Sequence, residues 1–103
     1  MAESFSYKLT NENDLFGFDF SPVLGASETL STAICTVAVK DGSDSNPSAI
    51  LYGGAVITGS KANQRIYGGI SETTYRLTMT VTTSAGNTFE LVGDLPVYDP
   101  SLI

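Results

Sequence analysis

The chain has 103 residues, which is enough for one domain with its own hydrophobic core and too few for a second domain. It contains no histidine and no tryptophan, and its single cysteine cannot form an internal disulfide. Eleven acidic residues against five basic ones give a net charge of −6, which repels phosphate groups, so neither nucleic acid nor a membrane is expected as a partner.

The first 13 residues form a polar segment that ends in the turn-forming run Asn-Glu-Asn. They predict an N-terminal arm, 1–13, rather than a core strand. The segment lacks the basic and then apolar pattern of a signal peptide, and no apolar run in the chain approaches the roughly 18 residues that span a bilayer. We therefore expect synthesis in the cytoplasm without insertion into a membrane.

Two strands are predicted in the first half of the chain. The run LFGFDF alternates and places Phe16, Phe18 and Phe20 on one side. The run TLSTAICTVAVK, 29–40, lacks the 3.6-residue spacing of a helix and has one face formed by Ala33, Cys35, Val37 and Val39. A loop rich in turn formers, DGSDSNPS, follows at 41–48.

The second half predicts further strands and one hairpin. Gly53-Gly54 separates two short apolar pieces, which predicts a bulge or a change of sheet. KANQRIY, 61–67, is mostly polar and predicts an edge or solvent-facing strand. TTYRLTMTVTT, 73–83, alternates apolar and polar residues, 84–87 closes a hairpin, and NTFELV returns with Phe89 and Leu91 on one face. DLPVYDPSLI ends the chain with two prolines and predicts an extended tail.

These patterns predict an all-β fold, an immunoglobulin-like β-sandwich of about seven antiparallel strands. The sandwich spans 14–97, between the N-terminal arm and a C-terminal tail at 98–103. Tyr75 opens the long strand after a glycine-containing turn, as in the tyrosine corner of immunoglobulin-like domains, where the hydroxyl bonds to the upstream backbone. The alternative for Tyr75 is a half-buried strand tyrosine with its hydroxyl in water.

The residues that carry most enzyme chemistry are missing. Without histidine, Ser-His-Asp and Cys-His arrangements are impossible, and Cys35 lies in an apolar alternation where a thiol packs as a small hydrophobe. Scattered acidic residues predict a solvated face rather than a glycosidase pair. The loop DGSDSN, 41–46, departs from the EF-hand pattern and is interpreted as a solvated turn, with a cation site as the alternative. We predict a non-enzymatic protein without cofactor or metal.

Threonines occupy one face of the long strand, at Thr74, Thr78, Thr80 and Thr82. Threonine combines β-propensity with a hydroxyl that faces water, so an ordinary exposed sheet surface explains the pattern. A hydroxyl-rich and weakly charged face is also suited to docking, because burying it costs less than burying lysine or glutamate.

Two long stretches resemble a family of small tailed-bacteriophage virion structural proteins of the fibre–tail adaptor type. These stretches are DFSPVLGASETLSTAICTVAV and ILYGGAVITGSKANQRIYGGISETTYRLTMTVTTSAGNTFELVGDLPV, and the resemblance covers about residues 16–97. It implies an immunoglobulin-like sandwich in the virion, made in the host cytoplasm, that joins fibres to the tail or neck. Its implied partners are other virion proteins of tail, neck or fibre, contacted in multiple copies within a symmetric assembly.

The two terminal segments carry scattered apolar residues in polar runs, which is typical of segments that order on contact with a partner. The candidate partner-binding residues are therefore Phe5, Tyr7, Leu9, Thr78, Thr80, Val97, Tyr98, Leu102 and Ile103. Two alternatives stay open at this point. One is a capsid decoration protein, and the other is a carbohydrate- or cell-surface-binding immunoglobulin-like module that uses Tyr52, Tyr67 and Tyr75.

Overall fold

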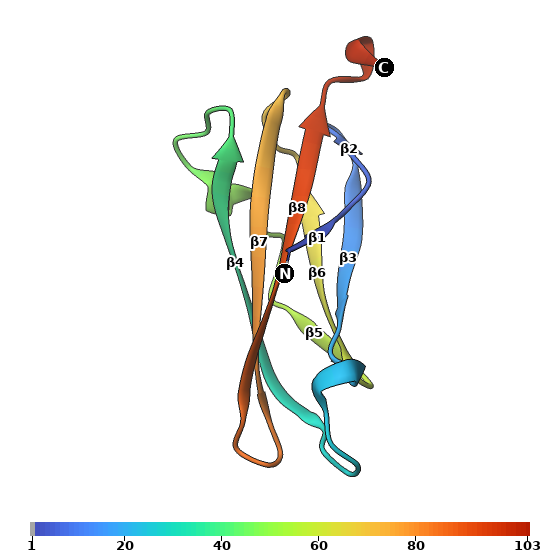
Figure 1. The fold of residues 1–103 in the computed structure, drawn as a ribbon. Helices are drawn as coiled ribbons and strands as arrows, with labels where there is room; N and C mark the ends of the chain where they lie inside the picture. Colours follow the sequence, from blue (N-terminus) through green and yellow to red (C-terminus); the bar gives the residue numbers. More distant parts are fainter. Residues whose placement is uncertain (1) are drawn as a thin grey trace.

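The computed structural model describes residues 2–103 as two β-sheets that pack face to face (Figure 1). The large sheet has the order β1-β8-β7-β4, with β2 also paired to β8, and the small sheet has the order β3-β6-β5. The large sheet contains β1 (Ala2–Ser4), β2 (Lys8–Leu9), β4 (Leu30–Asp41), β7 (Thr73–Thr83) and β8 (Thr88–Tyr98). The small sheet contains β3 (Asn13–Asp19), β5 (Val56–Thr58) and β6 (Lys61–Tyr67). Three short 3-10 helices are η1 (Ser21–Val23), η2 (Pro47–Ile50) and η3 (Pro100–Leu102).

The predicted all-β sandwich is confirmed, whereas its immunoglobulin-like topology stays a prediction. The described residues form eight strands rather than about seven, because two short strands lie within the first ten residues. Both of these strands pair in parallel with β8, so the sandwich is not purely antiparallel. Met1, the first residue of the expected arm, lies outside the described residues.

The hairpin of β7 and β8 is the longest local unit of the sandwich, and it follows the predicted alternation. Every second residue of β7 is buried, and the two strands pair antiparallel from Thr73 opposite Val97 to Thr82 opposite Thr88. The turn at 84–87 closes the hairpin, with Gly86 at a φ of 85° that favours glycine. An eleven-residue strand with one buried face has a strongly specified register.

Strand β4 pairs along β7 and directs Cys35 into the core, as predicted. Burial raises the pKa of the Cys35 thiol to about 11, so the group stays protonated near neutral pH. The core lies between the sheets, where Phe18 and Phe20 from the first strand of the small sheet and the turn after it are fully buried. The inward orientation predicted for these phenylalanines is confirmed.

The predicted edge position of 61–67 is wrong, since β6 is the central strand of the small sheet. Its inward-facing residues Ala62, Gln64 and Ile66 are buried. Gln64 tolerates burial because its side-chain amide donates hydrogen bonds to the backbone oxygens of Gly53 and Arg65, both at 3.0 Å. The opposite face of β6 is mostly exposed, so the solvent-facing part of the prediction is confirmed for that face.

The apolar piece before Gly53-Gly54 does not form a strand. Pro47 opens η2, and Leu51 makes only an isolated bridge with Ile66 of β6. The second piece forms β5 on the same small sheet, so the chain does not change sheets at the glycine pair.

Strand β8 continues through Pro96 to Tyr98, which is the first residue of the predicted tail, 98–103. The backbone oxygens of Asp94 and Tyr98 accept hydrogen bonds from the backbone N–H groups of Phe5 and Thr10. The backbone groups of every second residue in this stretch therefore point toward the N-terminal segment. Pro96 is one of these residues, and it has no backbone N–H to donate. The parallel ladder is interrupted at that point, which divides the N-terminal edge into β1 and β2.

The tyrosine-corner hydrogen bond predicted for Tyr75 is confirmed. Its side chain is fully buried, and its hydroxyl accepts a hydrogen bond from the backbone N–H of Ile70 at 2.8 Å. The hydroxyl also donates to Asp44 Oδ2 at 2.7 Å, which ties the 41–46 loop to the core. Burial and the bond to Asp44 raise the pKa of Tyr75 to about 12.

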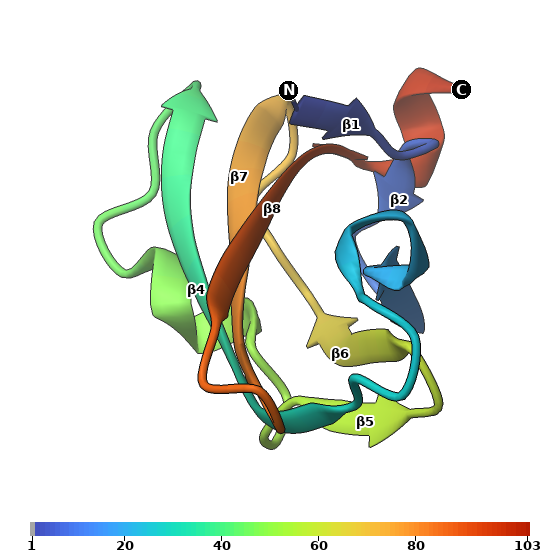
Figure 2. The same cartoon turned by 60° about the horizontal axis from the view of Figure 1, so that its bottom comes forward.

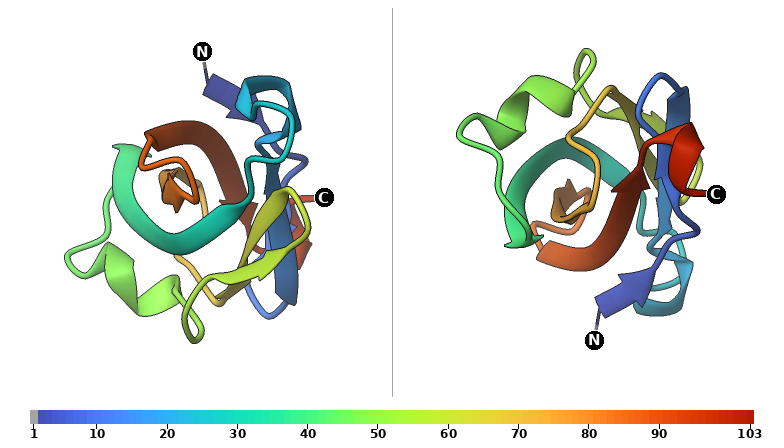
Figure 3. Two further views of the ribbon diagram at one scale, coloured as in Figure 1. Left: turned by 90° about the horizontal axis from the view of Figure 1, so that it is seen from below. Right: turned by 90° about the horizontal axis from the view of Figure 1, so that it is seen from above.

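The molecule is elongated, with extents of 47 × 23 × 22 Å. Viewed along the long axis, the large sheet is strongly curled and the small sheet lies against one side of it (Figure 3). Within residues 2–103, no helix is long and apolar enough to cross a membrane.

Candidate partner-binding surfaces

Residues predicted separately in the arm and the tail come together at one end of the molecule. Strand β2 pairs with the end of β8, and η3 lies beside it (Figures 1 and 2). The rings of Tyr7 and Tyr98 meet edge to face, with centroids 6.1 Å apart. We call this surface the terminal patch, and it comprises Tyr7, Leu9, Tyr98, Leu102 and Ile103.

The terminal patch is exposed but locally ordered. Ile103 is 67% exposed, and Leu102 and Tyr7 are about half exposed. Asp99 fixes the position of η3, because its backbone N–H donates to Ser71 Oγ and its carboxylate accepts from the backbone N–H of Ser101. That bond from Ser101 lowers the pKa of Asp99. The patch therefore offers apolar side chains on a backbone that is already positioned.

Two other candidate residues of the terminal segments point into the molecule. Val97 is fully buried in the core. Phe5 packs edge to face on Phe16 and Phe18, at centroid distances of 5.2 and 5.4 Å, and its ring lies against Gly93. A Cβ at Gly93 would overlap the Phe5 ring, so this close approach requires glycine. The side chains of Val97 and Phe5 attach the ends to the sandwich.

Lys8 is a buried residue that sequence reasoning did not single out. Its ammonium donates to the backbone oxygens of Gly68 at 2.6 Å and Leu9 at 2.8 Å. Burial lowers the pKa of Lys8, opposed by the negative charges of Glu12 and Asp14. The lysine fixes β2 against the turn that precedes β7. A single lysine between Tyr7 and Leu9 gives no sequence signal for this role.

Thr78 and Thr80 lie on the outer side of the large sheet, remote from the terminal patch. We call this surface the threonine face, formed on β7 by Thr74, Arg76, Thr78, Thr80 and Thr82. Its hydroxyls are partly used within the sheet, since Thr82 bonds to Thr32 at 2.6 Å and Thr80 donates to Glu90 at 3.0 Å. Ile34, opposite Thr80 on β4, is 65% exposed.

One charged network crosses the threonine face. Asp94 accepts hydrogen bonds from the Arg76 guanidinium at 2.8 and 3.0 Å and from the Lys40 ammonium at 3.0 Å. These two cations lower the pKa of Asp94 to about 2, with the Arg76 hydrogen bond as the largest cause. The network joins β4, β7 and β8 across the sheet.

Asp94→Asn is expected to lower the free energy of unfolding at neutral pH by about 1 kcal/mol, because the cations of this network are partly exposed to solvent. A carboxyl with a depressed folded-state pKa stabilises the fold above its unfolded pKa of about 4 and loses that contribution as the pH falls toward about 2. Denaturant titrations between pH 2 and 7 measure both effects. Asp41→Asn, at the end of β4, is the matched control, and an acid limb unchanged in Asp94→Asn would contradict the assignment.

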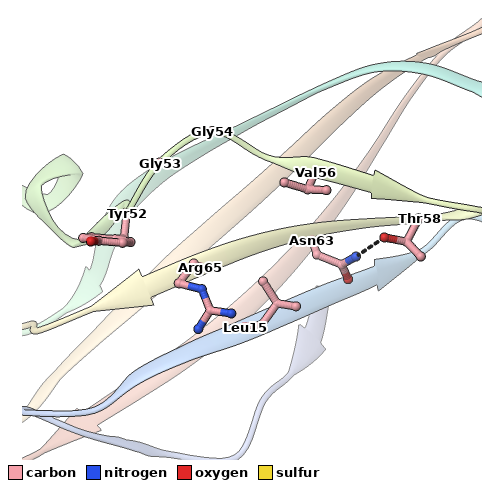
Figure 4. Close-up of a pocket in the computed structure, with 8 residues that line it drawn as sticks. All are labelled: Leu15, Tyr52, Gly53, Gly54, Val56, Thr58, Asn63 and Arg65. Carbon is pink, nitrogen blue, oxygen red and sulfur yellow. Dashed lines mark hydrogen bonds between the residues drawn. The ribbon is translucent and has the colours of Figure 1, made fainter.

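A depression of about 420 Å³ lies on the outer face of the small sheet (Figure 4). We call it the small-sheet groove, and it is lined by Leu15, Tyr52, Gly53, Gly54, Val56, Thr58, Asn63 and Arg65. Leu15, Val56 and Tyr52 are each about half exposed or more. The side-chain amide of Asn63 donates to Thr58 Oγ1 at 3.5 Å, the bond drawn in Figure 4. Sequence reasoning noted Tyr52 but did not predict this surface.

The described residues offer no cluster suited to metal binding. Within 2–103, no three histidine, cysteine, aspartate or glutamate side chains gather where one metal ion could be held. In the 41–46 loop, Asp44 is already engaged by the Tyr75 hydroxyl and by the backbone N–H of Asn46.

Comparison with protein families gives a match over most of the chain. The family model described as "Podophage GP4 fiber-tail adaptor protein gp77" matches residues 8–95, which extends from β2 through most of β8. No curated protein and no solved structure matches the chain.

Proposed function

Because the chain belongs to the family of podophage GP4 fiber-tail adaptor proteins, we propose that it joins its partners through two separate surfaces, the terminal patch and the threonine face. Membership of the family makes the protein a structural component of a phage virion that joins fibres to the tail and contacts other tail or fibre proteins. The match over residues 8–95 is the observation that carries this function.

The positions of the two surfaces support simultaneous contact with two components. The terminal patch lies at one end of a molecule that is 47 Å long, and the threonine face lies along its side (Figure 1). A partner at one surface therefore leaves the other surface free. The expected arm, 1–13, and tail, 98–103, contribute the apolar side chains of the terminal patch.

The protein acts without catalysis in this proposal. The chain has no histidine, and the raised pKa of its single cysteine keeps the thiol from acting as a nucleophile near neutral pH. The adaptor is made in the host cytoplasm and enters the particle in several copies, because fibres and tails are repeated around a symmetry axis.

The proposed function is tested on particles assembled with and without this chain. Particles that lack it are expected to carry tails but no fibres, and purified protein added back should restore the fibres. Quantitative mass spectrometry and electron cryo-microscopy of normal particles should place a small number of copies where fibres meet the tail. Hundreds of copies on the capsid shell would instead indicate a decoration protein, and fully fibred particles without the chain would contradict the adaptor function.

The arrangement of the tyrosines does not favour the carbohydrate-binding alternative. Tyr75 is fully buried, so it cannot contact a sugar. Tyr52 and Tyr67 are exposed, but their rings are inclined by 59° with centroids 6.4 Å apart. They do not form a single flat platform on which a sugar ring could stack.

A further inference from the structure

We propose that the small-sheet groove binds an extended segment of a neighbouring virion protein, one that presents apolar side chains around an acidic residue. The inference rests on the proposed adaptor function and assigns a recognition site for one of the two components. Three observations carry it, namely the shape of the groove, its apolar lining and the charge of Arg65.

The groove follows the central strand of the small sheet. Asn63 and Arg65 project from β6, Leu15 projects from β3 on one side, and Tyr52 and Val56 stand on the other side (Figure 4). Alternate residues of β6 thus face the groove at the spacing with which an extended partner presents its own side chains. The volume of about 420 Å³ lies within the range of roughly 300–1,000 Å³ that is typical of binding pockets.

Glycine opens one side of the groove. A Cβ at Gly53 or Gly54 would meet no atom within 4 Å, so the space beside them is empty. Leu15 is 47% and Val56 is 59% exposed, and neither is covered by another part of the described chain. Tyrosine and arginine, both present in the lining, are enriched at protein–protein interfaces.

Arg65 gives the groove its charge. Among the described residues, two of the five cations bind Asp94, Lys8 is buried, and Lys61 lies opposite Asp19 in the β3–β6 register. Arg65 instead lies opposite Leu15, and its guanidinium donates only to the neutral side-chain oxygen of Asn13 at 3.2 Å. No acidic residue lines the groove.

The Arg65 guanidinium has no carboxylate partner among the described residues and lies beside apolar side chains, so it is complementary to a carboxylate in an apolar segment. The planar guanidinium can bind both oxygens of a carboxylate at once, which adds direction as well as attraction. The rest of the molecule is acidic, with a net charge of −6, so this local positive charge selects which part of an acidic partner docks here. The same net charge opposes binding of a nucleic acid backbone.

Three substitutions at two sites test the groove without disturbing the core. Arg65→Met keeps most of the side-chain stem and removes the charge, whereas Arg65→Lys restores a positive charge. Gly54→Leu fills the groove, and Gly54 has no positive φ that would strain a side chain. The matched controls are Lys61→Met, on the same strand outside the groove lining, and Gly25→Leu, where an added Cβ meets only Glu28 Oε1 at 3.6 Å.

Binding is measured separately to tails purified from particles assembled without this chain and to isolated fibre protein of the same phage. Arg65→Met and Gly54→Leu are expected to weaken binding to one component at least about tenfold and to leave the other unchanged. Arg65→Lys should recover part of the loss, and the controls should bind like the unmodified protein. All variants should unfold at the same temperature, because the substituted sites are on the surface.

The possible failures are distinguishable. If the unmodified protein binds both components and the groove variants bind equally well, the groove inference is wrong and the adaptor function stands. If the unmodified protein binds neither component, the adaptor function and the inference both fail. Binding of a glycan array that Gly54→Leu abolishes, without any effect on tails or fibres, would overturn the protein-segment assignment.

Discussion

Tyr75→Ala is expected to lower the free energy of unfolding by about 3–5 kcal/mol, the cost of truncating a fully buried aromatic side chain. Tyr75 fills the core opposite Leu95, and its hydroxyl holds both the backbone of Ile70 and the carboxylate of Asp44. A domain of this size is stable by only about 5–15 kcal/mol, so the loss is a large fraction of the total. Denaturant unfolding followed by circular dichroism measures it.

Tyr75→Phe isolates the contribution of the hydroxyl. It leaves the Ile70 N–H and the Asp44 carboxylate without this partner and is expected to cost about 1–3 kcal/mol. Tyr67→Phe, at an exposed position, is the matched control and should change stability by less than about 0.5 kcal/mol. A Tyr75→Phe protein as stable as the unmodified one would show that the corner hydrogen bonds contribute nothing net.

The pH dependence of stability at alkaline pH tests the environment of Tyr75 independently of the substitutions. The folded-state pKa of Tyr75 is raised to about 12 from an ordinary value near 10, so the folded protein keeps a proton that the unfolded chain has lost. Stability should therefore fall as the pH rises from about 10 to about 12. Cys35 adds a similar fall between about 9 and about 11. Tyr75→Phe should remove the Tyr75 contribution between about 10 and about 12 and leave the Cys35 contribution in place.

The long strands were predictable because their burial repeats with period two. In β7 the alternation extends over eleven residues, and in β4 the inward face is apolar from Ala33 to Val39. The Tyr75 hydrogen bond was predictable for a different reason, namely that a recurrent local motif fixes both the tyrosine and its upstream backbone partner, here the N–H of Ile70.

The edges of the sandwich were not predictable, because they are short and depend on distant residues. A strand of two or three residues, such as β1 or β2, is too short to display a period, and its pairing with β8 joins opposite ends of the chain. The central position of β6 was hidden by Gln64, whose hydrogen bonds to the backbone replace those to water. Lys8 was hidden in the same way.

The candidate surfaces were predictable in part. Exposed apolar residues near both ends indicated a contact region, but only the fold brings Tyr7 beside Tyr98 and turns Val97 inward. The small-sheet groove combines residues from position 15 to position 65, and each of them fits an ordinary strand or turn when considered alone. No local pattern distinguishes such a site.

The triple substitution Tyr7→Ser, Leu102→Ser and Ile103→Ser is expected to weaken binding to one component, tail or fibre, by at least about a hundredfold. Apolar residues at the centre of an interface commonly cost more than about 1 kcal/mol each when truncated, and three of them together correspond to at least two decades in Kd. The fold should be unaffected, because all three side chains are about half exposed or more. Val23→Ser, in η1 at the opposite end of the molecule, is the exposed apolar control (Figure 1).

Which partner each variant no longer binds, the tail or the fibre, shows how the adaptor joins the two. If the terminal patch variant loses one component and the groove variant Arg65→Met loses the other, each of these two surfaces holds a different partner, and the assignment of the second partner to the threonine face is wrong. If both variants lose the same component, that partner covers both surfaces, and the threonine face must hold the second. A triple variant that still binds tails and fibres normally would remove the terminal patch from the interface, because three lost apolar contacts cannot be silent in a patch that carries the attachment.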